Sequence, residues 1–532
     1  MRVIDKTIGA LLAEVAATYP LQDALIHAEM GIRYNFERLS QEIDRSASGF
    51  ISTGINPGDR VALWAHNTIE WLLSFLGLIK IGAIVVPIDP NAAAENLQFI
   101  LEQSECRGLI IAGGPQHQKY AEMALAAKKK SGSLKSIIVF GETMSAELTS
   151  WTALAAEATR VENSTLSERA QAVDAKNPMA IMYPSGTTGQ PKGVVLDHLG
   201  LINKSMFSTE RQGITHEDRL CLFFPLFHMF GNTCIALAGL LRGAAMIMPS
   251  ETFEPSKILR AIADERCTAI YGSPSMLIAL IDHPEFKKED WQTVSKGTIG
   301  GAPCPMELMR RIVEDLGVSD ITVSYGITET SSWITMTHPT DPIQLRVSTI
   351  GTPLPCNEIK IIDPATGERL PPNRQGELCT RGFLMKGYYK MPAATAAAID
   401  KDQWFHTGDL GEMDEQGYVK ITGRLKDVIV RDGVEIFPVE IEEIIYRLAE
   451  ISEAQVFGFP HPEKGQEVAA WVRLKEGFQL PLDSLAAHVE AYLPENKWPK
   501  HYKIVSKFPM TGSGKIQKFK LAEMGQEEYI QR

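Results

Sequence analysis

The chain has 532 residues, of which 44% are hydrophobic and 22% are charged, so it can form several domains and bury a large core without a metal or disulfide scaffold. Its 53 Lys and Arg against 65 Asp and Glu give a formal charge of −12. With no run of five or more basic residues, this acidic balance argues against a nucleic-acid partner. The seven cysteines are scattered and never spaced as CxxC, which predicts reduced thiols.

The N-terminal residues include Asp5 and Glu14, where a signal peptide needs an uninterrupted apolar stretch. The most apolar window, residues 71–88, is broken by Lys80 and Gly82, so it suits a buried helix and strand better than a membrane span. The last four residues, YIQR, carry no peroxisomal address. We therefore expect a cytoplasmic protein without an integral membrane segment.

The first four hundred residues repeat a β-branched apolar run, a loop and a segment of helical spacing. Asn67 with Glu70 resembles a capping box that opens a helix ended by Gly82. The strand candidates in this part are residues 61–65, 83–88, 179–182, 220–224, 244–248, 269–271, 297–299 and 321–325. The pattern predicts an α/β fold with mostly parallel βαβ sheets covered by helices, in which ligands bind at the carboxyl ends of the strands.

The sequence pattern changes twice in the rest of the chain. Residues 348–423 contain short strands separated by Gly, Pro and Asp, which predicts a small β-rich subdomain. After Arg424 the pattern becomes α+β, with expected helices at 438–449 and 484–492 and expected strands at 454–459, 468–474 and 502–505. We therefore expect a large N-terminal domain over residues 1–424 and a small α+β domain over 425–532, a size usual for a domain.

One loop has the composition of a phosphate cradle. Residues 183–194 read YPSGTTGQPKGV directly after a predicted strand. Its small and hydroxylated residues let backbone N–H groups wrap an anion, and Lys192 adds a cation; these residues are Ser185, Gly186, Thr187, Thr188 and Gly189. The loop does not fit the Walker pattern GxxxxGK[ST], so a P-loop NTPase is disfavoured. By composition alone, an ordinary surface loop explains it as well.

A second motif, YGITET at residues 325–330, also follows a predicted strand. The Thr328 hydroxyl and the Glu329 carboxylate could hold a phosphate and its Mg²⁺, because Mg²⁺ prefers one or two carboxylates together with phosphate oxygens. The alternative is that Thr328 caps a helix and Glu329 is solvated. Three further segments, WFHTGDLG (404–411), GRLKD (423–427) and PMTGSGKIQK (509–518), taken singly contain only turn and surface residues.

Together these five motifs, in this order, resemble those of the adenylate-forming superfamily, which includes acyl-CoA synthetases, adenylation domains and firefly luciferases. The resemblance extends over essentially the whole chain. It is closest to fatty-acid and aryl acyl-CoA ligases, because PLFHMFG (225–231), GGAP (300–303) and IFPVEIEEII (436–445) are of that type. The resemblance implies that the small C-terminal domain is mobile and carries the catalytic lysine.

The resemblance also implies the site residues. The loop from Ser185 to Lys192 would hold the β- and γ-phosphates of ATP, Thr328 would contact the α-phosphate, and Glu329 would help to bind Mg²⁺. Adenine would be lined by Gly300, Gly301, Ala302, Tyr325 and Gly326. Asp409 would accept hydrogen bonds from both ribose hydroxyls, and Arg424 would support ribose and phosphate from the other side.

Four further positions take roles from the resemblance. Lys515 would stabilise charge during adenylation, and Lys426 would be the hinge about which the terminal domain swings. His228 would gate the path between the acyl pocket and the CoA tunnel, although a core histidine is almost as good an interpretation. Gly433 would border the tunnel for the CoA thiol. Two departures from the family pattern are Asp432, where a second glycine is common, and Pro184, which lacks a backbone donor.

The function expected from this resemblance is ATP- and Mg²⁺-dependent ligation of an acid to coenzyme A. The alternatives are an acyl-AMP ligase that loads a carrier protein, a luciferase-like adenylate oxygenase and a non-catalytic nucleotide-binding protein. The apolar residues Met229, Phe230, Ile327 and Trp333 favour a hydrophobic monocarboxylic acid, whether medium-chain aliphatic, alicyclic or aromatic. The expected partners are thus small molecules, and a homodimer stays open.

Overall fold

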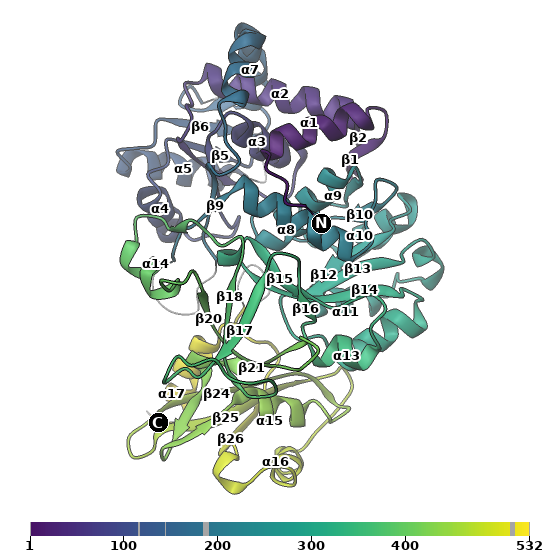
Figure 1. Ribbon diagram of the computed structural model, residues 1–532, viewed down its shortest axis with the longest axis vertical. Coiled ribbons are helices and arrows are strands. Elements are labelled where there is room, and N and C mark those ends of the chain that lie inside the picture. The colour runs from purple at the N-terminus through teal and green to yellow at the C-terminus, as the bar shows by residue number, and fades with distance from the viewer. Residues whose placement is uncertain (1, 115–116, 144, 185–190, 511–515, 531–532) are drawn as a thin grey trace. The chain divides into compact units, whose positions relative to one another are not determined.

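The computed structural model describes residues 2–114, 117–143, 145–184, 191–510 and 516–530 (Figure 1). Among these residues the chain divides into two compact units. Unit 1 consists of residues 2–184, 191–358 and 381–399, and unit 2 consists of residues 359–380 and 400–530. Most of the β-rich segment expected in the large domain thus groups with the C-terminal residues, and the boundary predicted at residue 424 lies inside unit 2.

The larger sheet of unit 1 has nine strands. In sheet order they are β16 (Thr352–Pro353), β15 (Ser332–Met336), β14 (Asp320–Ile327), β13 (Lys296–Gly300), β12 (Ala269–Gly272), β10 (Arg219–Cys221), β11 (Ala245–Met248), β1 (Asp23–His27) and β2 (Ile32–Asn35). Strands β14 to β1 pair in parallel, and β16, β15 and β2 are antiparallel additions at the edges.

The second sheet of unit 1 has eight strands. In sheet order they are β19 (Gly387–Tyr388), β9 (Val194–Asp197), β8 (Pro178–Met182), β4 (Ile84–Pro87), β3 (Arg60–Trp64), β5 (Gly108–Ile111), β6 (Ser136–Val139) and β7 (Thr149–Ser150). Strands β8 to β7 are parallel, and β9 and β19 are antiparallel. The predicted α/β fold with mostly parallel sheets is confirmed.

Helices cover these sheets, because a parallel connection must cross over a face of the sheet. The α-helices of unit 1 are α1 (Ile8–Thr18), α2 (Phe36–Ser52), α3 (Ile69–Lys80), α4 (Ala94–Gln103), α5 (Gln118–Lys130), α6 (Trp151–Glu157), α7 (Asn163–Gln171), α8 (His198–Arg211), α9 (Ala238–Arg242), α10 (Pro255–Asp264), α11 (Pro274–Ile281), α12 (Met306–Arg310), α13 (Ile343–Ser348) and α14 (Pro392–Ala398). Helix α8 contacts β9 of one sheet and β15 of the other, so it packs between them. No helix of the described residues is both long and apolar enough to span a bilayer.

The start of α3 differs from the prediction. Thr68 is its N-cap, and the Thr68 hydroxyl accepts the N–H of Trp71 at 3.1 Å. The Asn67 amide instead bonds the backbone of another loop, donating to the carbonyl of Phe224 at 3.0 Å and accepting the N–H of Leu226 at 2.8 Å. The capping box predicted at Asn67 is therefore wrong, because Asn67 is engaged in a tertiary contact and Thr68, the next residue and also a favoured N-cap type, caps the helix instead.

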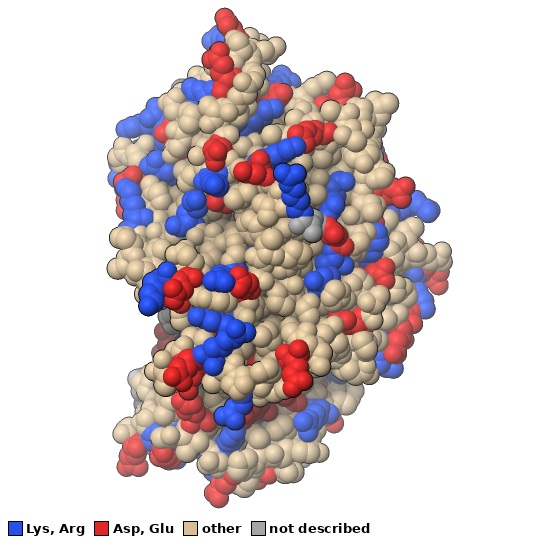
Figure 2. Space-filling model, in the orientation of Figure 1, with Lys and Arg blue, Asp and Glu red and all other residues tan. Residues whose placement is uncertain are grey.

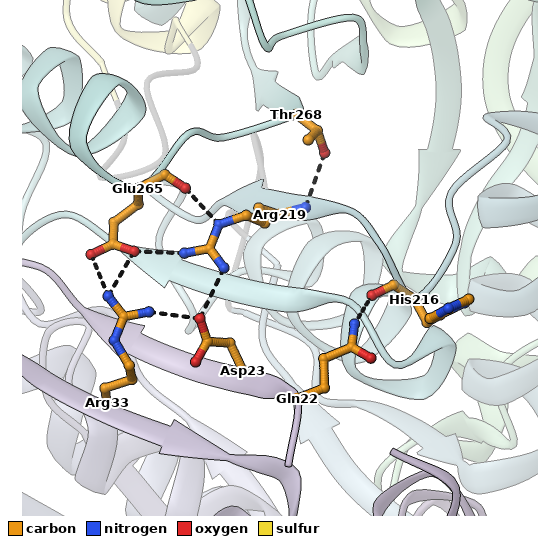
Figure 3. A network of polar contacts seen from close by, with 7 residues as sticks. All are labelled: Gln22, Asp23, Arg33, His216, Arg219, Glu265 and Thr268. Atoms are coloured by element: carbon orange, nitrogen blue, oxygen red, sulfur yellow. Dashed lines mark hydrogen bonds and ion pairs between the residues drawn. The ribbon is translucent and has the colours of Figure 1, made fainter. Parts of the chain in front are cut away.

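Polar contacts between the side chains of two arginines and two acids join strands of the nine-stranded sheet (Figure 3). Arg33 of β2 lies 2.6 Å from Asp23 of β1 and 2.8 Å from Glu265, which follows α10. Arg219 of β10 lies 3.0 Å from Asp23 and 2.6 Å from Glu265. These contacts link β1, β2 and β10 to the end of α10, although each partly exposed pair contributes only about 0–1 kcal/mol.

Unit 2 contains two sheets. The first has β17 (Glu358–Ile362), β18 (Gly376–Arg381), β20 (Phe405–Met413) and β21 (Val419–Arg424) in that order. The second has β23 (Val434–Ile436), β22 (Ile429–Arg431), β25 (Gly465–Leu474) and β24 (Ile451–His461), with β26 (His501–Ile504) also paired to β25. Its helices are α15 (Pro438–Ile445), α16 (Leu482–Glu490) and α17 (Lys518–Tyr529).

Surface charges of both signs are interspersed on the face drawn in Figure 2. Lys and Arg lie beside Asp and Glu over most of this face, and they do not gather into one basic stripe. A phosphate backbone binds best to a continuous basic surface.

Candidate active site

The YGITET motif forms a tight turn between β14 and β15. The 3₁₀ turn η6 (Thr328–Thr330) follows β14, and Ser331 after it has a left-handed backbone with φ 55°. Thr330 is fully buried, and its hydroxyl lies 2.9 Å from the carbonyl oxygens of both Ile327 and Ser332. Thr330 thereby fixes the turn that presents the half-buried side chains of Thr328 and Glu329.

Two glycines of the expected adenine site are required by close packing. A Cβ on Gly326 would lie 2.1 Å from the carbonyl oxygen of Ser332, and a Cβ on Gly300 would lie 2.9 Å from the Trp333 ring. Gly301, with φ 85°, then turns the chain toward the exposed Ala302. Gly300 ends β13 and pairs with Ser324, the residue before Tyr325. The structure thus brings all five predicted adenine-site residues to one edge of the sheet, at the carboxyl ends of adjacent parallel strands.

Tyr388 connects Glu329 to Lys192. The Tyr388 hydroxyl donates to Glu329 Oε1 at 3.0 Å, and the Lys192 ammonium lies 4.9 Å from the centre of the Tyr388 ring. The backbone of Glu329 is also bound to the segment that precedes Tyr388, because the Met385 N–H donates to the Glu329 carbonyl oxygen at 2.8 Å. Strand β19 brings Tyr388 here by pairing it with Val194, two residues after Lys192. Tyr388 therefore holds a carboxylate and an ammonium close together, in a cation–π contact on one side and a hydrogen bond on the other.

The geometry at Glu329 suits a magnesium ion. Oε1 accepts the Tyr388 hydroxyl, whereas the structure gives Oε2 no hydrogen-bond partner among the described residues. A carboxylate with one oxygen oriented by the protein and the other open can bind Mg²⁺ together with phosphate oxygens and water. The sequence did not single out Tyr388, and the only signal was its place in the short GYY segment that pairs with β9.

Aromatic side chains pack around Trp333 of β15, the strand that follows the Thr328–Thr330 turn. The rings of Phe230 and Trp333 meet edge to face with centroids 5.0 Å apart, and Phe224 lies 4.6 Å from Phe230 and 5.4 Å from His228. His228 Nδ1 accepts the Phe230 N–H at 3.1 Å, which places the proton of the neutral imidazole on Nε2. Phe230 begins η3 (Phe230–Leu237), a π-helical segment of the kind often found at functional sites. The predicted gate residue thus lies half-buried in an apolar aromatic group.

A fully buried lysine holds the strand behind these rings. Lys204 of α8 donates to the Trp333 carbonyl oxygen at 2.8 Å and to the side-chain oxygen of Asn357. Both acceptors are neutral, so no carboxylate offsets the cost of burying the ammonium. Burial lowers the pKa of Lys204 to about 7.

We expect Lys204 to make stability rise with pH. Its pKa is about 7 in the folded chain and about 10 when unfolded. Between those values the unfolded state binds more protons, so the free energy of unfolding increases as pH rises, by at most about 1.4 kcal/mol per pH unit. Urea unfolding midpoints at about pH 7 and about pH 9 should therefore rise more for the wild type than for Lys204→Met. Parallel changes in the two proteins would contradict this expectation.

Unit 2 pairs Asp409 with Arg424. The two residues are cross-strand neighbours in β20 and β21, and Arg424 Nε lies 2.8 Å from Asp409 Oδ1. Asp409 is buried, with 4% of its surface exposed, whereas the Arg424 side chain is 43% exposed. The Asp409 N–H donates to the Thr407 hydroxyl at 3.0 Å, and that hydroxyl donates to the Leu378 carbonyl at 2.7 Å. The predicted ribose residue is thus oriented by its neighbours.

The predicted hinge and tunnel residues follow β21. Lys426 is exposed in the 3₁₀ turn η7 (Leu425–Asp427). Asp432 and Gly433, with φ 52° and 78°, form the two-residue turn of the β22–β23 hairpin. Asp-Gly is a favoured sequence for such a turn, since both positions need positive φ. The turn therefore accounts for Asp432, where the family often has glycine. It also accounts for Gly433, since packing does not require a glycine there: a Cβ on Gly433 would meet no atom within 4 Å.

Six predicted site residues lie outside the described residues: Ser185, Gly186, Thr187, Thr188, Gly189 and Lys515. The segments beside them are described. The first five residues lie between β8 and β9, which are antiparallel neighbours. Lys515 lies between Met510 and Ile516, which form an isolated antiparallel bridge.

Comparison with known proteins identifies the family of this chain. Residues 12–389 match the family described as AMP-binding enzyme, and residues 440–515 match the AMP-binding enzyme C-terminal domain. The two matched regions together include every predicted site residue except Arg424, Lys426, Gly433 and Asp409, which fall between them. The chain belongs to the family of AMP-binding enzymes.

Two curated relatives and one solved structure show which AMP-binding enzymes this chain is similar to. YngI of Bacillus subtilis (strain 168), which bears an acyl-CoA synthetase name, is 40% identical over 535 residues, with 98% of this chain and 97% of that protein covered. The human mitochondrial medium-chain acyl-CoA ligase ACSF2 is 34% identical over 539 residues, with 98% of this chain and 87% of that protein covered. Among solved structures, ATP-bound MatB from Rhodopseudomonas palustris has a TM-score of 0.85 and 26% identity, with 99% of this chain and 100% of that chain covered. Within the family, the relatives are thus acyl-CoA synthetases and ligases, as the sequence motifs predicted.

Proposed function

We propose that this chain is an acid:CoA ligase that activates a hydrophobic monocarboxylic acid with ATP. The carboxylate attacks the α-phosphorus of ATP and forms an acyl-adenylate with release of pyrophosphate, and the thiol of coenzyme A then displaces AMP. Such transfers depend on positioning and on neutralising charge. The proposal is supported by the acyl-CoA ligase name of ACSF2 and by the ATP in the MatB structure.

The observation that carries the proposal is the contact of Tyr388 with both Glu329 and Lys192. It gives unit 1 a carboxylate suited to Mg²⁺ and a cation suited to phosphate on either side of one ring. Mg²⁺ held by Glu329 would supply positive charge to the phosphates. Lys192 would neutralise further phosphate charge, and the adjacent Thr328 hydroxyl would donate to the α-phosphate.

The remaining nucleotide contacts are assigned by the same proposal. The buried Asp409 carboxylate would accept the ribose hydroxyls, and Arg424, already paired with it, would add a cation near the phosphates. Ser185 to Gly189 would supply backbone N–H groups to the β- and γ-phosphates. Lys515 would stabilise the charge that develops during adenylation, and rotation at Lys426 would then remove it from the site.

The acid is expected to be apolar and to carry one carboxylate. The buried aromatic side chains of Phe224, Phe230 and Trp333 pack together, and an acyl group bound against this apolar cluster would be aliphatic, alicyclic or aromatic. The medium-chain substrate in the name of ACSF2 supports the aliphatic choice. Because one methylene changes binding by only about 1–3 kcal/mol, neighbouring chain lengths should compete.

The acid and the thiol acceptor can be tested together. Purified chain is incubated with ATP, Mg²⁺ and CoA over a panel of short-, medium- and long-chain, aromatic and dicarboxylic acids, and products are identified by mass spectrometry. The proposal predicts acyl-CoA, AMP and pyrophosphate in equal amounts, with a medium-chain or aromatic monocarboxylic acid preferred. Acyl-adenylate that accumulates without acyl-CoA would instead favour a carrier-protein acceptor, and light emission with oxygen would favour an oxygenase.

Tyr388 is expected to position the metal-binding carboxylate. Tyr388→Phe removes the hydroxyl that orients Glu329 Oε1 and keeps the ring that faces Lys192. A hydrogen bond to a charged group contributes about 1.5–3 kcal/mol, so we expect the Mg²⁺ concentration for half-maximal adenylation to rise about tenfold or more. Binding of Mn²⁺ in the presence of ATP, followed by electron paramagnetic resonance, should weaken in parallel. Tyr389→Phe, which removes the neighbouring hydroxyl, is the control, and equal weakening in both variants would contradict the assignment.

A further inference from the structure

Three metal-ligating side chains that the proposed ligase reaction does not use meet in unit 2. Glu377 and Cys379 lie two residues apart in β18 and therefore on one face of the sheet. His406 of the adjacent strand β20 is the cross-strand partner of Cys379. A carboxylate oxygen, a sulfur and a ring nitrogen of these residues all lie within 4.8 Å of one another. This set of O, S and N donors is typical of zinc sites.

The two distances from His406 Nδ1 to the other ligand atoms are close to those around a tetrahedral ion. Cys379 Sγ lies 3.6 Å from His406 Nδ1. Zn–S and Zn–N bonds of about 2.3 and 2.0 Å at a tetrahedral angle place sulfur and nitrogen about 3.5 Å apart, so these two atoms need to move by only about 0.1 Å. Glu377 Oε2 lies 2.9 Å from His406 Nδ1, and the carboxylate would need to move outward by only about 0.4 Å to take its place in the same tetrahedron.

Two neighbouring groups are placed to become outer contacts of a metal site. Asp400 Oδ2 lies 3.8 Å from His406 Nε2 and 3.7 Å from Lys360 Nζ, so it would have to approach His406 by about 1 Å to accept this N–H, as carboxylates do in many zinc sites. Glu377 Oε1 accepts the Gly408 N–H at 3.1 Å, which orients the carboxylate. Glu377 and Cys379 are buried, whereas 31% of the His406 side chain is exposed and gives an ion a path to the site.

We propose that Glu377, Cys379 and His406 bind one thiophilic divalent cation of the Zn²⁺ type, separate from the Mg²⁺ of the ligase reaction, with water as the fourth ligand. On binding, a metal–sulfur bond replaces the S–H bond and the thiol proton passes to solvent. The imidazole proton that His406 Nδ1 shares with Glu377 moves to Nε2, where it faces Asp400. The thiolate and the carboxylate then balance the two charges of the cation.

The site has a direct connection to the candidate active site residue Asp409. Glu377 would bind the cation with Oε2 while Oε1 still holds the N–H of Gly408, the residue that precedes Asp409. The position of the Glu377 carboxylate is thus shared between the cation and the turn that carries the proposed ribose ligand. Glu377 thus connects the proposed cation site to the turn that carries Asp409.

The site can be tested with Co²⁺ as a spectroscopic probe of the full-length chain. We expect one Co²⁺ per chain, a thiolate-to-cobalt charge-transfer band in the near ultraviolet and the visible bands of a tetrahedral ion, all removed by one equivalent of Zn²⁺. Cys379→Ser should abolish the charge-transfer band and weaken Zn²⁺ binding by at least about tenfold. Cys356→Ser, which removes an exposed thiol elsewhere in the chain, should leave both unchanged.

A second variant decides the question if Cys379→Ser does not fold, as judged by circular dichroism. His406→Gln removes the nitrogen ligand at a partly exposed position and should weaken Zn²⁺ binding by about tenfold while the sulfur band remains at high Co²⁺. The proposal is overturned if the wild type shows no thiolate band, if the band survives in Cys379→Ser, if it is lost in Cys356→Ser, or if His406→Gln binds Zn²⁺ like the wild type.

Discussion

Replacing Lys515 by alanine is expected to slow acyl-adenylate formation about 10²–10³-fold. The proposed function places this ammonium against charge that develops on the α-phosphate and the attacking carboxylate, and loss of one such preorganised charge contact has an effect of this size. Formation of the thioester from supplied acyl-adenylate and CoA should stay largely unchanged, because the terminal domain would by then have rotated about Lys426 and removed Lys515 from the site.

The two half-reactions should be measured separately by rapid quench. Lys507→Ala is the matched control, since it removes the same charge from an exposed position in the same terminal region and should leave both steps near the wild-type rates. Equal slowing of both half-reactions by Lys515→Ala would contradict a role confined to adenylation. A Lys507→Ala variant with the same defect would indicate that net charge, not position, is responsible.

The second large effect is expected on stability, at the buried ion pair of Arg431 and Glu467. Their side chains are 5% and 3% exposed, and Arg431 Nη1 lies 2.6 Å from Glu467 Oε1. Arg431 also donates to the carbonyl oxygens of Trp498 at 2.8 Å and Asn496 at 2.6 Å. Arg431→Met would leave a buried carboxylate with Lys464 as its remaining ion-pair partner among the described residues.

We expect Arg431→Met to lower the opening free energy of β25 by about 3 kcal/mol, because breaking a buried pair is strongly destabilising and leaves the Glu467 carboxylate with only the partly exposed Lys464 among the described residues to offset its charge. Hydrogen–deuterium exchange of residues 465–474 in the full chain should show the loss. Lys497→Met breaks the more exposed pair with Glu440, whose side chains are 25% and 40% exposed, and should cost less than about 1 kcal/mol. Similar losses of protection in the two variants would contradict the special importance of Arg431.

The same pair should make β25 sensitive to acid. Burial alone would raise the pKa of Glu467, but the hydrogen bonds from Arg431 and Lys464 outweigh it and lower this pKa to about 2. A carboxylate with a lowered folded pKa stabilises the fold above its unfolded pKa of about 4.3, and this contribution is lost as pH falls from there toward 2. Exchange protection of β25 should decline over that range in the wild type and less steeply in Arg431→Met.

Much of the fold could be predicted from the sequence, because parallel strands of buried β-branched residues alternate with amphipathic helices. The predicted strand at 321–325 is β14, and the predicted helix at 438–449 begins at Pro438 as α15, although it ends at Ile445. Periodicity fixes such elements but not their ends. The N-cap of α3 escaped prediction for another reason, since Asn67 bonds a loop more than 150 residues away, and no local pattern contains that partner.

The residues of the candidate site also fall into two groups, those that a local motif displays and those that meet only through tertiary pairing. Glu329, Thr328 and Asp409 lie in motifs that the sequence displays, and strand register brings Asp409 beside Arg424. Tyr388, Lys204 and the group of Glu377, Cys379 and His406 are supporting or separate residues, and each depends on pairing between segments far apart in the chain. Their chemistry is visible only when the strands are placed side by side.

The most direct test of the proposed function is acid-dependent exchange of labelled pyrophosphate into ATP in the absence of CoA. If the chain adenylates carboxylic acids, a medium-chain or aromatic monocarboxylic acid will drive exchange that requires Mg²⁺ and is strongly reduced in Lys515→Ala. Exchange that no acid of the panel supports, in a protein that binds ATP, would contradict adenylation as the chemistry of this site.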